Sequence, residues 1–156
     1  NDGFKVVLDA MNAERILIAS ECIGDARYFI KKATEYASNR IVFDRPIGAN
    51  QGVSFPLARA YANMVAAKLL VEKAATLFDA NEHCGAEANM CKLLASEVSW
   101  FAGDTAMQTF GGFAFSKEYH IERKFRETRL YQIAPVSTNL ILSYIAEREL
   151  GLPRSF

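Results

Sequence analysis

The chain of 156 residues is long enough for one domain with a substantial hydrophobic core, but not for two ordinary domains. Eighteen Lys and Arg residues balance eighteen Asp and Glu residues, so no net charge attracts nucleic acid, and a 51% apolar composition is typical of a globular protein. No apolar run reaches the roughly 20 residues that cross a bilayer, so we expect no membrane span. Three cysteines without a Cys-x-x-Cys pair favour buried thiols in a reducing compartment over a disulfide framework.

Three long segments carry apolar residues at helical spacing. In each segment these positions alternate by three and four, which places them along one face of a long helix. The seam positions are Ile16, Ala19, Ile23, Ala26, Ile30, Ala33 and Ala37 in the first segment, Leu57, Ala60, Met64, Ala67, Val71, Ala74 and Phe78 in the second, and Cys91, Leu94, Val98, Phe101, Thr105 and Gln108 in the third. Long helices with short connections pack as a near-antiparallel bundle. We therefore expect an all-α fold, an up-down helical bundle of three long helices and one shorter C-terminal helix, without a sheet.

Capping residues and helix breakers predict where the first two helices begin. Asn12 has a side chain suited to cap the first helix. A loop with Pro and Gly over 40–53 follows that helix, and Ser54 two residues before Pro56 is typical of a helix start. The first helix is therefore expected to begin after Asn12 and the second at Ser54.

The C-terminal third is expected to hold two short helices. The glycine pair at 111–112 would end the third long helix. A basic helix would cover 119–128, and Ser137 or Thr138 would cap a last helix over 140–150.

The side chains that usually bind metals do not form a recognisable pattern. His83 and His120 are the two histidines, and neither has the Glu-x-x-His spacing of di-iron bundles. Zinc needs three or four convergent nitrogen or sulfur ligands, so His83 beside Cys84 favours an exposed turn over a metal site. The chain also carries no phosphate-binding loop, dinucleotide fingerprint or Gly-x-Ser-x-Gly motif. We therefore expect no bound metal.

A local basic cluster follows position 120. Its members are Arg123, Lys124, Arg126 and Arg129. Glu122 and Glu127 interleave with them, which favours a solvent-exposed helix face with pairs of opposite charge. The alternative is a contact with cofactor phosphates or with a neighbouring subunit. Both interpretations stay open on the sequence alone.

The segment over 106–116 is the most informative part of the chain. A helical pattern runs up to Gln108 and stops at Gly111 and Gly112. Glycine at the end of a helix commonly terminates it. Adjacent glycines also let a ligand approach the backbone closely, and a Gln side chain offers both a donor and an acceptor. The spacing alone leaves both interpretations open.

An ordered set of motifs resembles the C-terminal helical domain of the acyl-CoA dehydrogenases. The set comprises 40–48 followed by Gln51, the Gln-x-x-Gly-Gly run at 108–112, and the basic segment at 119–129. Members of that family carry similar segments in the same order, and the resemblance spans nearly the whole chain. It implies that 1–156 is a single C-terminal domain of a longer protein, which also has an N-terminal helical domain and a middle β-domain.

The resemblance implies an FAD site. The cofactor-binding positions in this chain are Arg40, Phe43, Gln51, Gln108, Gly111, Gly112, Ser137 and Asn139. Arg40 matches an arginine that contacts the FAD pyrophosphate of a neighbouring subunit, and a guanidinium suits pyrophosphate because it donates in a forked geometry. Gln108 and the glycines match a segment along the ADP part of FAD, and Ser137 and Asn139 match residues near the flavin.

The catalytic base is the point where the sequence departs from most of the family. The usual glutamate falls at Pro135, which cannot accept a proton. In the isovaleryl-CoA and long-chain branches the base comes from the first helix of this domain, and Glu14 matches that position. The resemblance therefore implies Glu14 as the catalytic base and Asn12 and Arg15 as substrate-binding residues. Without the family, Glu14 would be an acidic residue favoured by the dipole in a first helical turn, and Arg15 a partner for an acid.

By resemblance, the whole protein is an FAD-dependent acyl-CoA dehydrogenase that converts an acyl-CoA thioester to a 2-enoyl-CoA. The resemblance also implies an electron acceptor flavoprotein or other acceptor, a homodimer or homotetramer, and a cytoplasmic location, with the mitochondrial matrix as the alternative. Two other functions remain open: a flavin oxidase or monooxygenase of the same fold, or a non-catalytic oligomerisation bundle. We expect the isolated domain to bind FAD weakly and to be inactive.

Overall fold

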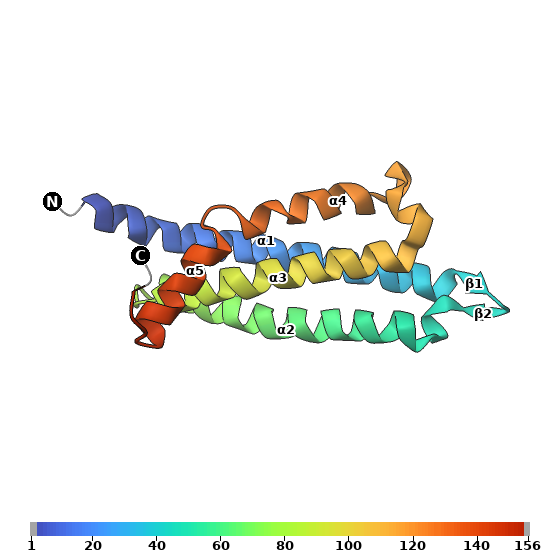
Figure 1. Ribbon diagram of the computed structural model, residues 1–156, viewed down its shortest axis with the longest axis horizontal. Coiled ribbons are helices and arrows are strands. Elements are labelled where there is room, and N and C mark those ends of the chain that lie inside the picture. The colour runs from blue at the N-terminus through green and yellow to red at the C-terminus, as the bar shows by residue number, and fades with distance from the viewer. Residues whose placement is uncertain (1–2, 155–156) are drawn as a thin grey trace.

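Helices make up most of the computed structural model, which describes residues 3–154 (Figure 1). Three long helices run side by side: α1 (Gly3–Asn39), α2 (Gln51–Asp79) and α3 (Gly85–Phe110). Two short helices, α4 (Ile121–Thr128) and α5 (Thr138–Tyr144), return along the bundle toward the N-terminal end. The expected all-α up-down bundle is confirmed. Within the described residues, no helix is long and apolar enough to cross a bilayer.

The helix α3 forms the centre of the bundle, because it packs against α1, α2, α4 and α5. Its buried residues are mostly small, and Ala88, Ala95, Ala102 and Ala106 are at most 1% exposed. Small side chains let neighbouring helices approach closely on more than one side. The core therefore surrounds α3 rather than lying along one of its faces.

The burial expected for the three apolar seams is found in two of the helices and only partly in the third. Those of α1 and α2 are buried, apart from the half-buried Ile30 and the exposed Phe78. The seam expected for α3 is only partly right, because Leu94 and Gln108 are exposed. A helix that is covered on several sides buries residues all round, so a single-face pattern does not describe it.

Two helices begin earlier than their capping residues indicate. The helix α1 begins at Gly3, and no proline before Asn12 interrupts it. The Asn12 side chain accepts a hydrogen bond from Arg15 Nη1 at 3.0 Å instead of capping a helix. The helix α2 begins at Gln51, so Pro56 lies inside the helix rather than in its first turn.

A small hairpin after α1 corrects the expectation of no sheet. Strand β1 (Ile41–Val42) pairs antiparallel with β2 (Arg45–Pro46). Phe43 and Asp44 connect the strands with positive φ angles of 51° and 61°, as a two-residue type I′ turn requires. Turns of this type usually carry Asn-Gly or Asp-Gly, so the Phe-Asp pair in the sequence gave no sign of a hairpin.

The C-terminal segment follows its capping prediction. Ser137 caps α5, and its hydroxyl oxygen accepts a hydrogen bond from the Leu140 N–H at 3.4 Å. A π-helical turn, η5 (Ile145–Glu149), continues α5, so the helix expected over 140–150 has two parts. Short 3₁₀ turns join the other elements: η1 (Ile47–Ala49), η2 (Gly111–Phe115), η3 (Lys117–Tyr119) and η4 (Leu130–Gln132).

The three cysteines are buried and form no disulfide bond, as expected from their number and spacing. Burial raises the pKa of Cys22 and of Cys91 to about 12. A thiol with so high a pKa stays protonated and unreactive at neutral pH. Cys22 and Cys91 therefore serve the core as small apolar side chains.

Gly103 and Gly24 offer a matched test of the packing around α3. A Cβ at Gly103 would lie 3.1 Å from a Phe125 ring atom and 3.3 Å from a Phe29 ring atom, whereas a Cβ at Gly24 would meet nothing within 4 Å. We expect Gly103→Val to lower the free energy of unfolding by about 1–3 kcal/mol through overpacking. Gly24→Ala should raise it by roughly 0.5–1 kcal/mol, because alanine favours helix. Urea unfolding measures both changes, and a fully stable Gly103→Val protein contradicts the packing.

Candidate cofactor and catalytic site

A cavity of about 500 Å³ lies where α1 and α3 end beside each other. Arg40, which follows α1, contributes one wall. Gln108, Gly111 and Gly112 contribute another wall at the end of α3. The structure therefore brings these four expected cofactor-binding residues together.

Aromatic side chains hold the two sides of this cavity in place. Tyr36 on α1 stacks on Phe110 at the end of α3, with ring centroids 4.3 Å apart. Phe113 and Tyr119 pack edge-on against Tyr36, at 6.4 and 6.3 Å. Such ring pairs contribute about 0.5–1.5 kcal/mol each beyond their burial. They fix the turn on which the two glycines lie.

The backbone conformation requires glycine at position 111 but not at position 112. Gly111 directly follows α3 and has a φ of +57°, which L residues rarely adopt. Gly112 has no positive φ, and a Cβ built on it meets nothing within 4 Å. Nothing inside the described chain therefore requires glycine at 112. Gly111 ends the helix, whereas Gly112 leaves open space beside the cavity.

A second cavity of about 600 Å³ adjoins the first, because Gln108 and Thr109 line both. Gly52, near the start of α2, lines its other side. Gln51 precedes Gly52 and is exposed as the first residue of α2. Phe43 lines neither cavity, and its side chain is 93% exposed at the tip of the hairpin. Gln51 and Phe43 thus flank the cavities without closing them.

The expected catalytic residues lie at the other end of the bundle. Met11 on α1 packs against a small apolar cluster formed by Leu93, Val136 and Ile141. Glu14 lies one helical turn after Met11, and Pro135 directly precedes Val136. The structure therefore places the two alternative positions for a catalytic base on segments that pack together.

Glu14 is exposed, and no salt bridge joins it to another residue in 3–154. Because α1 begins at Gly3, Glu14 lies about three turns into the helix. The interpretation of Glu14 as a first-turn residue favoured by the helix dipole is therefore wrong, since the dipole acts within the first turn. Its carboxylate remains accessible to a ligand.

Arg15 points the other way, into the bundle, and is only 9% exposed. It donates to the Asn12 side chain, and its Nε has no acceptor among the described residues. Burial lowers the pKa of Arg15, while the nearby Tyr144 and Glu14 oppose this effect. Within 3–154 no salt bridge supports the interpretation of Arg15 as the partner of an acid.

The expected cofactor residues fall into two groups that do not share a pocket on one chain. Ser137 and Asn139 lie at the start of α5, close to Lys92 on α3, whose Nζ donates to the Val136 carbonyl at 2.8 Å. Gly111 lies beyond the other end of α3. The helix between Lys92 and Gly111 is roughly 28 Å long at 1.5 Å per residue. Figure 1 shows α5 and the hairpin at opposite ends of the bundle.

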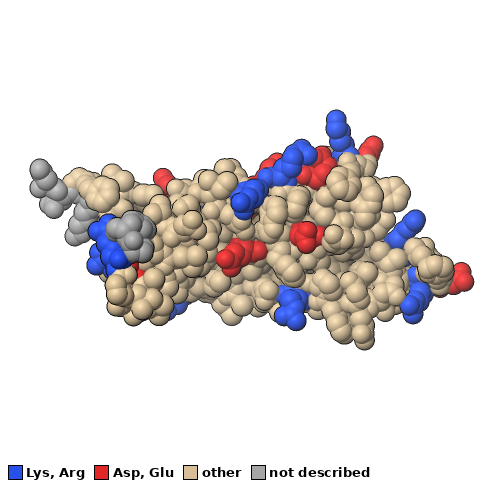
Figure 2. Space-filling model, viewed as in Figure 1, with Lys and Arg blue, Asp and Glu red and all other residues tan. Residues whose placement is uncertain are grey.

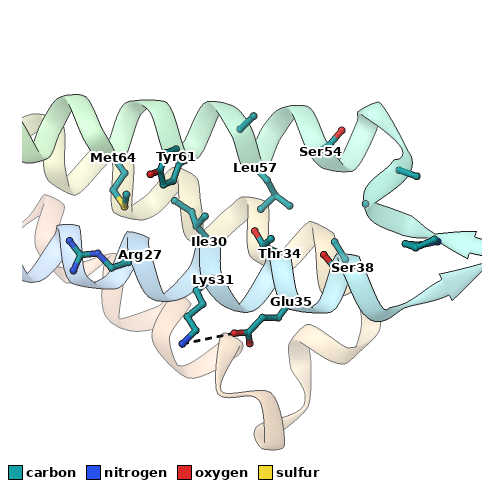
Figure 3. Close-up of a pocket in the computed structure, with 15 residues that line it drawn as sticks. Arg27, Ile30, Lys31, Thr34, Glu35, Ser38, Ser54, Leu57, Tyr61 and Met64 are labelled. Carbon is teal, nitrogen blue, oxygen red and sulfur yellow. Dashed lines mark ion pairs between the residues drawn. The ribbon is translucent and has the colours of Figure 1, made fainter.

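A larger hollow than either of these, about 890 Å³, lies between α1 and α2 and is lined by none of the expected site residues (Figure 3). Ile30, Leu57 and Met64 give it mostly apolar walls. Lys31 and Glu35 also line it, and they pair with each other at 3.9 Å. Arg27, Thr34 and Tyr61 add polar groups to its lining, but none of the expected catalytic or cofactor-binding residues lines it, so size alone does not mark the site.

Three of the four members of the basic cluster pair with acidic residues of the same chain, and the fourth, Arg129, donates to the Gln132 side chain instead. Arg123 pairs with Glu127 at 2.7 Å, and Lys124 pairs with Asp25 of α1 at 2.6 Å. Figure 2 shows Lys and Arg next to Asp and Glu along this face. The interpretation as a charged, solvent-exposed helix face is therefore favoured over a phosphate site. Among the described residues, no group of three or more His, Cys, Asp or Glu could hold a metal ion.

Sequence reasoning missed the buried polar residues that fasten the C-terminal segment. Lys92 has no exposed surface, and its ammonium binds the Val136 carbonyl. The Tyr131 hydroxyl donates to Glu21 on α1 at 2.7 Å. A lysine inside the apolar pattern of α3 was visible in the sequence, but lysine usually lies at the surface. Only the central place of α3 in the bundle reveals its role.

Comparison with known proteins identifies the family. Residues 1–150 match the family model for the acyl-CoA dehydrogenase C-terminal domain. Acyl-CoA dehydrogenase FadE12 of Mycobacterium tuberculosis is 41% identical over 148 residues, which cover 94% of this chain and 38% of that protein. The chain therefore spans about two fifths of the length of this relative.

Solved structures share the fold. The butyryl-CoA dehydrogenase of Megasphaera elsdenii has a TM-score of 0.92 at 30% identity, over 96% of this chain and 39% of that chain. The structure of PigA with FAD and proline has a TM-score of 0.87 at 27% identity, over 91% of this chain and 37% of that chain. With the family match over 1–150, these similarities establish that the chain belongs to the acyl-CoA dehydrogenase family, as its C-terminal domain.

Proposed function

We propose that the whole protein is an FAD-dependent acyl-CoA dehydrogenase that converts an acyl-CoA thioester to a 2-enoyl-CoA. One observation carries this proposal: Met11, one helical turn before Glu14, packs against the apolar cluster that contains Val136. The exposed carboxylate of Glu14 thus lies at the same end of the bundle as Pro135, which cannot act as a base. The family membership of the domain supports the same reaction.

The reaction removes a proton from the α-carbon and a hydride from the β-carbon of the acyl chain. Glu14 takes the α-proton and becomes a neutral acid, while the electrons of that C–H bond form the new double bond. When bound, FAD would supply the acceptor for the β-hydride. A thioester α-proton is weakly acidic, so the base must be held close to it and shielded from water. Asn12 and Arg15 help to bind the substrate: Asn12 lies near Glu14, and the buried Arg15 acts through the hydrogen bond that it donates to the Asn12 side chain.

The cavity at the end of α3 fits the ADP part of FAD. Arg40 offers a guanidinium for the pyrophosphate, and Gln108 offers a donor and an acceptor. Gly112 leaves space that a side chain would fill. Gln51 and Phe43 flank this region, and Ser137 and Asn139 would lie near the flavin at the other end.

Completing a site requires two copies of the chain. The Gly112 end and the Glu14 end are separated by most of α3, so one chain does not bring them together around one cofactor. We propose that each site combines the Glu14 end of one subunit with the Gly112 end of its neighbour, in a homodimer or homotetramer. A lone domain then supplies only part of the FAD shell and binds FAD weakly.

The second candidate is flavin oxidase or monooxygenase chemistry, because PigA with FAD and proline shares the fold. The dehydrogenase proposal instead requires an electron acceptor flavoprotein or another acceptor to reoxidise FAD. Anaerobic mixing with butyryl-CoA, octanoyl-CoA or isovaleryl-CoA, followed by admission of air, distinguishes the two. Flavin that is reduced by an acyl-CoA without oxygen and is reoxidised only slowly by air supports the dehydrogenase, whereas rapid reoxidation by air supports an oxidase.

Glu14→Gln tests the base directly, because glutamine keeps the shape of the side chain but cannot take the proton. A general base contributes about 10²–10⁴-fold, so flavin reduction by the best acyl-CoA should slow by at least about a hundredfold. FAD content should not change. Glu35→Gln, the same change on an exposed residue farther along α1, is the matched control. Stopped-flow reduction as fast as in wild type would place the base elsewhere.

Gly112→Val and Gly111→Ala separate cofactor binding from helix termination. Gly112→Val should release FAD yet change apoprotein stability by less than about 0.5 kcal/mol, because its side chain meets nothing within 4 Å. Gly111→Ala should lower apoprotein stability by about 1–2 kcal/mol, because of its left-handed φ. FAD occupancy and apoprotein melting are measured together on both variants. Full occupancy with a lower melting temperature in Gly112→Val would mean that this glycine serves only the fold.

A further inference from the structure

Lys92 is a fully buried lysine, which is rare in proteins unless the ammonium is paired. Its Nζ donates to the Val136 carbonyl oxygen at 2.8 Å. Within the described part of the chain, no carboxylate forms a salt bridge with it. Burial lowers the pKa of Lys92, and the nearby groups that also shift it are Cys22 and Arg15, neither of which has a carboxylate. The one hydrogen bond of the ammonium within the described residues is therefore to a backbone carbonyl.

The segment before α5 is held from several sides. Leu93, the neighbour of Lys92 on α3, shares a buried apolar cluster with Val136 and Ile141, so α3 binds the Val136 carbonyl and contributes to the cluster that holds the Val136 side chain. The Thr138 hydroxyl donates to the Gln132 carbonyl at 3.2 Å and closes the loop. The Val136 peptide group therefore has a fixed orientation.

That orientation sets the direction of the next N–H group. In a planar trans peptide the C=O and the following N–H point in opposite directions. Because Lys92 draws the Val136 carbonyl toward α3, the Ser137 N–H points away from α3. Ser137 is half-buried, and its N–H has no acceptor among the described residues. Backbone N–H groups that lose water on burial are almost always paired, so a donor held in this way is suited to a ligand.

We propose that Lys92 is a positioning residue: through the Val136 carbonyl it presents the Ser137 N–H as a hydrogen-bond donor to an acceptor atom of the bound flavin. The inference rests on the proposed function, because it needs FAD at the Glu14 end of the bundle. It assigns to Lys92 no contact with the cofactor itself. The ammonium acts only by fixing one peptide plane.

Three substitutions in the full-length protein test this assignment. Lys92→Met keeps the length of the side chain and removes its donor. Ser137→Pro removes the N–H, and the φ of −64° at Ser137 suits proline without strain. Ser137→Ala is the matched control, because it removes the capping hydroxyl but keeps the N–H.

The readouts are the visible absorption band of bound flavin, the Kd of FAD, and the rate of flavin reduction at saturating acyl-CoA. Of butyryl-CoA, octanoyl-CoA and isovaleryl-CoA, the one that reduces wild type fastest is used throughout. Lys92→Met and Ser137→Pro should shift the flavin band and weaken FAD binding or slow reduction by at least about tenfold, as the loss of a positioned donor does. Ser137→Ala, which loses only the hydroxyl, should have a smaller effect on the band than Ser137→Pro. The double variant should be no worse than the worse single variant, since both remove one interaction.

The outcomes separate this inference from the proposed function. A Lys92→Met protein that melts earlier but keeps the flavin band, FAD affinity and reduction rate would mean that Lys92 is only structural. If Lys92→Met does not fold, Ser137→Pro against Ser137→Ala decides, and equal behaviour of these two overturns the inference. Wild-type protein that binds no FAD would overturn the proposed function and this inference with it. Wild type that is reduced normally, with an unaffected Ser137→Pro variant, overturns only the role of Lys92.

Discussion

The helix α3 is covered on several sides by other helices, and its packing surfaces determine where those helices are placed. Its alanines and Gly103 let α1, α2 and α4 approach closely, with Phe29 and Phe125 in contact at Gly103. Because α3 is long and straight through the bundle, it also sets the distance between the two ends of the molecule. The Gly112 turn forms at its C-terminal end, and the segment of Val136 packs near its N-terminal end.

Buried polar contacts hold the C-terminal segments in place, because these segments are too short to be stable on their own. Helices as short as α4 and α5 are marginal in isolation. Lys124 ties α4 to Asp25, Tyr131 ties the following turn to Glu21, and Lys92 ties Val136 to α3. Hydrogen bonds that involve charged groups contribute about 1.5–3 kcal/mol each, and an unpaired buried partner would cost a similar amount. The Glu14 end of the bundle is therefore ordered by electrostatics as much as by apolar packing.

Sequence patterns predicted best where a residue's environment depends on its own helix. The seams of α1 and α2 and the cap at Ser137 follow from spacing and local chemistry, and the structure confirms them. The seam of α3 failed because a central helix has no single buried face. The roles of Gly111 and Gly112 differ in the φ angle and in the atoms around each residue, and neither can be read from the sequence. The family resemblance supplied Glu14, but only the packing of Met11 against the apolar cluster of Val136 brings this part of α1 to the segment of Pro135.

The central claim is that each site joins the Glu14 end of one subunit to the Gly112 end of another. Mixing the inactive variants Glu14→Gln and Gly112→Val and reassembling them as hybrid oligomers tests it most directly. In a mixed dimer, one of the two sites then receives an intact Glu14 from one subunit and an intact Gly112 from the other. Random reassembly should restore about a quarter of wild-type acyl-CoA-dependent flavin reduction. Activity no greater than the average of the two separate variants would show that one chain supplies both ends and would contradict the account.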